Sequence, residues 1–111
     1  MADLSIKFDI DDLRTIAFGA VGAGYTAIGN SSDYPIVQFI VQNFTDVDLL
    51  FSIDGINDKF RLPADGFWNC DVAANKQGDK SAALPVGTTF YVKQDGVPAS
   101  GSVDVVLCYL R

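Results

Sequence analysis

Short runs of β-branched and aromatic residues, separated by turn residues, recur along the whole chain of 111 residues. The last quarter shows the pattern most clearly. Residues 88–93 and 102–110 are two such runs, and residues 94–101 between them hold two glycines and a proline. Val, Ile, Thr, Tyr and Phe favour strands, whereas Gly, Pro, Asp and Ser favour turns. The pattern predicts an all-β chain whose last two runs form a strand pair, with the final strand buried in a sheet.

Strict alternation marks the first expected strand. In residues 4–10, Leu4, Ile6, Phe8 and Ile10 share one face, while polar residues occupy the other. A period of two is typical of a half-buried strand. The other expected strands are residues 13–21, 25–28, 36–43, 47–53, 60–62 and 67–72. No stretch has a useful helical period, so the sequence predicts an antiparallel β-sandwich or jelly roll of about eight strands.

Turn residues indicate how these strands connect. Residues 44–46 are expected to turn the chain so that residues 47–53 pair with residues 36–43. The Asp-Gly pair at residues 54–55 is a strong turn signal. The polar, glycine-containing residues 73–83 are expected to form a loop.

The length of the chain fits one domain. We divide it into residues 1–12, an N-terminal strand or arm, and residues 13–111, a single β-sandwich domain. Whether residues 1–12 form an arm that pairs with a neighbouring subunit or an ordinary edge strand of the same sandwich is left open by the sequence.

Two residue types are missing, and their absence limits the chemistry. The chain has no His, and its 14 acidic residues are all Asp. Without His, Ser–His and Cys–His catalysis is impossible within the chain, and the commonest metal ligand is lacking. Most of the Asp residues fall in expected turns, which does not favour a catalytic carboxylate pair. We therefore expect no enzyme, no catalytic residues, no cofactor and no metal site.

Charge and hydropathy exclude further classes. The net charge is −6, and the eight Lys and Arg residues are scattered, so a nucleic-acid-binding surface is not expected. The apolar runs are too short to span a bilayer. The first residues lack the basic and apolar pattern of a signal peptide. We therefore expect a chain that is not exported, with Cys70 and Cys108 reduced and buried.

Two segments allow a second interpretation. The oxygen-rich residues 54–58 predict a turn that is held by Asp hydrogen bonds. The alternative is that Asp54 and Asp58 bind a cation. Trp68 reads as a core residue, and a sugar-binding platform is the alternative. The glycines at positions 19, 22 and 24 lack the following helix of a phosphate loop and read as a bend.

Several short sequence segments, in the order in which they occur, resemble small structural proteins of tailed bacteriophages. They are RTIAFG at residues 14–19, YTAIG at 25–29, QNFTD at 42–46, FSIDG at 51–55, DV at 71–72, NK at 75–76, LPVGTTFYVK at 84–93 and GSV at 101–103. The resemblance covers most of the chain from about residue 14 and assigns no chemical role to any residue.

The resemblance implies a β-sandwich component of the virion, assembled in the host bacterial cytoplasm, that needs no cofactor. It implies a capsid decoration (cement) protein or a head–tail ring protein. The partners would be the major capsid protein or portal and tail proteins, together with further copies of the chain. A receptor- or carbohydrate-binding module is a further alternative. The interface residues that we expect are Leu4, Ile6, Phe8, Tyr34, Phe44 and Phe67.

Overall fold

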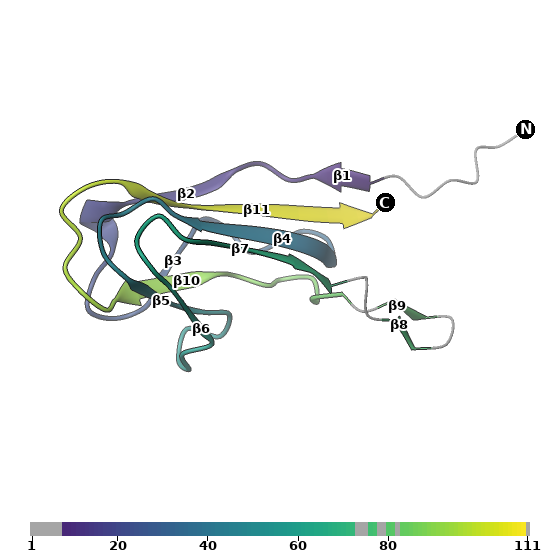
Figure 1. The fold of residues 1–111 in the computed structure, drawn as a ribbon. Coiled ribbons are helices and arrows are strands. Elements are labelled where there is room, and N and C mark those ends of the chain that lie inside the picture. Colours follow the sequence, from purple (N-terminus) through teal and green to yellow (C-terminus); the bar gives the residue numbers. More distant parts are fainter. Residues whose placement is uncertain (1–7, 73–75, 78–79, 82, 111) are drawn as a thin grey trace, which may run out of the picture.

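The computed structural model describes residues 8–72, 76–77, 80–81 and 83–110. Its main feature is two antiparallel sheets packed face to face (Figure 1), as expected for a β-sandwich. Sheet A contains β1 (Phe8–Ile10), β2 (Arg14–Ala17), β4 (Ile36–Asn43), β7 (Phe67–Asp71) and β11 (Ser102–Leu110). Sheet B contains β3 (Thr26–Ala27), β5 (Leu49–Ser52), β6 (Phe60–Leu62) and β10 (Tyr91–Gln94).

The long strand β11 lies inside sheet A. It pairs with β4 on one side and with β1 and then β2 on the other, while β7 pairs with the far side of β4. The expectation of a buried final strand is therefore confirmed. The expected pairing of residues 88–93 with 102–110 is wrong, because β10 lies in sheet B between β3 and β5.

The expected hairpin of residues 36–43 with 47–53 is also wrong, because β4 and β5 belong to different sheets. The chain crosses between the sheets at the fully buried Asn43. The Asn43 amide nitrogen donates to the carbonyl oxygens of Val47, Leu62 and Pro63, and its side-chain oxygen accepts from Thr45. These bonds fix a corner, and both edges of β4 are already paired with β11 and β7.

Smaller differences concern element ends. The expected strand over residues 13–21 ends at Ala17 and continues as a short 3-10 helix, η1 (Phe18–Ala20). The expected loop over residues 73–83 contains a paired segment, β8 (Lys76–Gln77) with β9 (Lys80–Ser81). The expected turn after β5 is confirmed, since β5 pairs with β6 and Gly55 adopts a positive φ of 75°.

The core lies between the two sheets. Alternate residues of the central strands point inward, as the period of two requires. The fully buried large apolar side chains are Ile28, Ile36, Val41, Leu49, Phe51, Phe90, Val92, Val103, Val105 and Leu107. Trp68, expected in the core, is 40% exposed and packs edge-on against Phe39 and Phe60. It therefore lies at the margin of the core.

Candidate functional site

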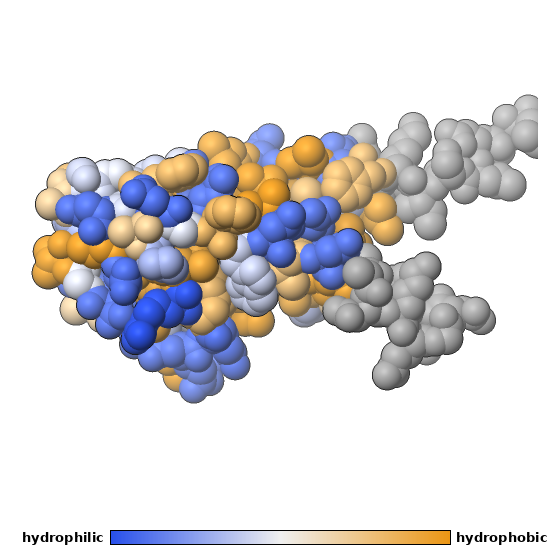
Figure 2. All heavy atoms as spheres, in the orientation of Figure 1, coloured by the Kyte–Doolittle hydropathy of each residue, from blue (hydrophilic) through white to orange (hydrophobic). Residues whose placement is uncertain are grey.

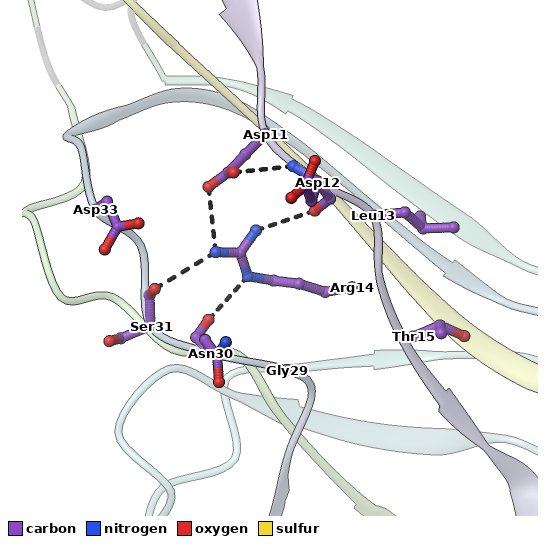
Figure 3. Close-up of a pocket in the computed structure, with 9 residues that line it drawn as sticks. All are labelled: Asp11, Asp12, Leu13, Arg14, Thr15, Gly29, Asn30, Ser31 and Asp33. Atoms are coloured by element: carbon purple, nitrogen blue, oxygen red, sulfur yellow. Dashed lines mark hydrogen bonds and ion pairs between the residues drawn. The ribbon is translucent and has the colours of Figure 1, made fainter.

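A polar hollow of about 630 Å³ surrounds Arg14, along the edge of sheet A where β1 passes into β2 (Figure 3). The Arg14 guanidinium is largely buried. It donates to the carbonyl oxygens of Asp12, Asn30 and Ser31 at 3.2, 2.8 and 3.4 Å, and to the Asp11 carboxylate at 3.2 Å. Sequence reasoning missed this cluster, because Asn30 and Ser31 are 16 and 17 positions from Arg14 in the chain.

The Arg14 side chain joins two chain segments, residues 11–14 and residues 30–31, and we call this group the Arg14 clamp. Four acceptors already occupy most of the guanidinium donors, so few remain for a substrate anion. Gly29 lies directly against the Arg14 side chain with a positive φ of 72°, a conformation that favours glycine. The arrangement fixes the loop before β4 and contains no nucleophile paired with a base.

The turn at Asp54 is saturated with hydrogen bonds from its own segment. Its carboxylate accepts from the Ser52 hydroxyl at 2.7 Å, from the backbone N–H groups of Ile56 and Asn57 at 2.9 Å, and from the Asn57 amide. These donors, first that of Ser52, hold the pKa of Asp54 well below its ordinary value. The geometry fits the expected Asp-stabilised turn.

Asp58 belongs to a different group, on the surface of sheet B. It accepts from the Tyr25 hydroxyl and pairs with Lys93 at 3.0 Å, and Lys93 lies over the Tyr25 ring. The pKa of Asp58 is lowered by these two donors, first by Tyr25. The pKa of Tyr25 is raised, first by burial and then by its bond to Asp58. Within the described part of the chain, no three carboxylate or cysteine side chains gather in a metal-binding arrangement.

The two cysteines are unpaired. Cys108 is buried, and burial raises the pKa of its thiol. Cys70 is partly exposed, so the expectation of two buried cysteines holds for Cys108 alone.

An apolar surface feature lies on part of the outer face of sheet A, over β1, β11 and the middle of β4. On β11, Val105 and Leu107 are fully buried, so Val106 points outward. It lies opposite Ile40 of β4, and Leu110 lies opposite Phe8 of β1. We call the following group the outer patch: Phe8, Ile10, Leu13, Ile40, Val106 and Leu110.

Three members of the outer patch are more than half exposed: Phe8 (54%), Ile10 (60%) and Leu13 (59%). Leu13 points away from the Arg14 clamp (Figure 3). Figure 2 shows hydrophobic surface over β1 and β11, with hydrophilic residues beside it. A group of this kind is unlike the scattered apolar residues that are normal on a protein surface.

A second apolar feature is a pocket of about 300 Å³ at the margin of the sandwich, where β7 of sheet A faces β6 of sheet B. We call it the edge pocket. Its lining is apolar except for Lys59 at the rim, and it consists of Phe39, Ile53, Lys59, Phe60, Trp68, Cys70, Val72 and Leu84.

The expected interface residues do not form one cluster. Phe8 belongs to the outer patch, Phe67 is 68% exposed on the opposite edge strand, and Phe44 is exposed in the corner after β4. Tyr34 is partly exposed and stacks on Tyr109 at 4.2 Å. Leu4 and Ile6 lie outside the described residues, and whether any of the six contacts a partner stays a prediction.

Most of the outer patch was missed by sequence reasoning. The available signal was an apolar residue at an outward position of each strand, Ile40 in β4 and Val106 in β11. In an antiparallel sheet with one solvated face, the outward positions are normally polar. Val106 and Ile40 break that rule locally, between outward positions that hold Asp104, Gln42 and Gln38.

Comparison with known protein families, curated proteins and solved structures found no match for this chain. No helix among the described residues is long and apolar enough to cross a membrane. The function of the chain is therefore inferred from the surfaces described above.

Proposed function

We propose that this chain is a structural protein of a tailed bacteriophage virion, and that it acts as a capsid decoration protein. The observation that carries the proposal is the outer patch, an exposed apolar group on a domain of net charge −6. Contiguous exposed apolar surface marks sites of protein–protein contact. The sequence segments that resemble phage structural proteins, and their order, support a location in the virion.

The physical logic of such a protein requires no catalysis. A protein that binds the assembled shell and not the free subunits stabilises the shell by mass action. The outer patch would meet the capsid surface, and the bonded corner at Asn43 and the Arg14 clamp would keep the face rigid. Rigid interfaces lose less entropy when they bind.

The runner-up function is a ring component of the head–tail junction or tail. In a ring, an apolar surface of the same kind would form the contact between copies of the chain. The mass of the purified protein separates the two, because a stable ring of six or more copies would favour the ring and contradict the simple decoration role. A carbohydrate-binding module is less favoured, because the Trp68 ring is packed against Phe39 and Phe60.

The test mixes the purified chain with expanded phage heads that were assembled without this protein. Sedimentation then measures how much of the chain binds to the heads. Ile10→Asp places a charge in the outer patch at a position that is 60% exposed. Val97→Asp makes the same kind of change at a position that is 76% exposed and outside the patch. We expect the Ile10 variant to lose at least tenfold in affinity and the Val97 variant to bind as the unchanged chain does.

Far-UV circular dichroism of both variants verifies that the strands are retained. If the unchanged chain does not sediment with heads, the decoration proposal is wrong. Equal binding by the two variants would show that the outer patch is not the contact surface.

A further inference from the structure

The edge strand β7 has one open side, and the hydrogen-bond pattern shows which residues face it. In an antiparallel pair, opposite residues alternate between hydrogen-bonded and non-bonded positions. The Asn43 N–H donates to the Gly66 carbonyl at 2.8 Å, which sets Asn43 and Gly66 as a bonded pair. Counting along the register, Trp68 and Cys70 are bonded to β4, whereas Phe67 and Asn69 are in non-bonded positions.

Residues in non-bonded positions turn their backbone N–H and C=O groups to the other side of the strand. For Phe67 and Asn69 that side is the open edge of sheet A. In the part of the chain that the structure describes, no backbone hydrogen bond pairs either residue on this side. Such an edge is a template for another strand.

The edge pocket lies directly beneath the same strand. Trp68 and Cys70 of β7 line it, together with Phe39 and Phe60. These aromatic rings already contact one another edge-on, with centroids of Trp68 and Phe60 4.7 Å apart. A strand added to β7 would place the side chains opposite Trp68 and Cys70 on the pocket side, and the side chain between them on the outer face. The edge thus selects an apolar–polar–apolar segment.

We propose that residues 1–7 of a second copy add to β7 as a further strand, with Leu4 and Ile6 over the edge pocket and Ser5 on the outer face beside Asn69. The sequence Leu4-Ser5-Ile6 has the required alternation. Seven extended residues span about 23 Å, more than the roughly 17 Å of a five-residue strand. Asp3 and Lys7 balance in charge, so this segment adds no repulsion to a chain of net charge −6.

The segment must come from another copy. In sheet A, β1 lies on the side of β11 away from β4 and β7. From Phe8 to a strand beyond β7 is about four strand spacings, or roughly 19 Å. Leu4 and Ile6 are four and two residues before Phe8, so they reach at most about 14 and 7 Å from it and cannot pair with β7 of their own copy.

The test uses the full chain and its single tryptophan. Trp68 is 40% exposed, so a strand laid over the edge pocket would shield it. With rising protein concentration we expect light scattering to report association, and acrylamide quenching of Trp68 to fall over the same range. Neither measurement depends on the proposed role in the virion.

Leu4→Asp and Ser5→Asp form a matched pair, since each adds one charge to the same segment on opposite faces. We expect Leu4→Asp, and likewise Ile6→Asp, to weaken association by on the order of tenfold, the loss of one buried aliphatic side chain. Ser5→Asp should change it by less than about twofold. Circular dichroism verifies the fold of each variant.

Three outcomes would overturn the proposal. These are the absence of association at any concentration, association with unchanged quenching of Trp68, and equal losses of affinity in the Leu4 and Ser5 variants. Association that is lost only in Ile10→Asp would assign the contact to the outer patch instead.

Discussion

A single buried amide determines where the chain leaves sheet A. Asn43 is fully buried, and its side chain satisfies three carbonyl oxygens as well as the backbone N–H and hydroxyl of Thr45. Asn43→Ala would leave these groups without partners, and each buried unsatisfied group costs about 1–3 kcal/mol. We expect the free energy of unfolding in urea to fall by about 3 kcal/mol. Asn69→Ala, at an exposed position, is the control and should cost less than about 1 kcal/mol.

The Asp54 turn gives a prediction about pH. Its pKa is lowered in the folded protein, first by the Ser52 hydroxyl bond. A lowered pKa means that the charged form stabilises the fold above the unfolded pKa of about 4, and that this stabilisation is lost as the pH falls through the folded value. Asp54→Asn should therefore unfold more readily than the unchanged chain at pH 7. The difference should shrink toward pH 2, as followed by thermal unfolding at each pH. A difference that does not vary with pH would contradict it.

At the scale of elements, the sequence revealed where strands are and not which sheet they join. The expected runs at residues 36–43 and 102–110 match β4 and β11. The two expected pairings, of residues 36–43 with 47–53 and of 88–93 with 102–110, were both wrong. Turn residues report that the chain reverses, whereas the choice of sheet here depends on Asn43 bonding to residues 62 and 63, about 20 positions away.

The candidate surfaces were predictable only in part, for the same reason. Exposed aromatic residues such as Phe8 and Phe67 were identified one by one. The outer patch and the edge pocket are assembled from strands whose register the sequence does not show. Ile40 meets Val106, and Trp68 meets Phe39 and Phe60, only once the sheets are formed.

Neighbouring residues of β11 test the assignment of its two faces. Leu107 is fully buried between the sheets, whereas Val106 points to the outer face. Leu107→Ala should lower the free energy of unfolding by about 3 kcal/mol, because it opens a cavity in the core. Val106→Ala should cost less than about 1 kcal/mol. Urea titration of both variants measures the difference, and equal losses would mean that both sides of β11 are packed.

At the scale of the whole molecule, sheets A and B share one core, and neither has a separate one. Val92 of sheet B and Leu107 of sheet A are both fully buried in that core. A small domain of this kind is expected to unfold in one cooperative step. Its thermal unfolding should therefore give the same midpoint by far-UV circular dichroism, which reports all strands, and by the fluorescence of Trp68, which reports the edge of sheet A.

Variants of core residues in the two sheets test whether the sheets unfold together. Val92→Ala and Leu107→Ala should each lower both midpoints together, by roughly 10 °C for a loss of about 2–3 kcal/mol. If the sheets were independent, Val92→Ala would move the circular dichroism midpoint and leave that of Trp68 in place. Coincident shifts would establish that the outer patch and the edge pocket, at opposite sides of sheet A, are held by one packed core. A partner bound at either surface would then stabilise the whole domain.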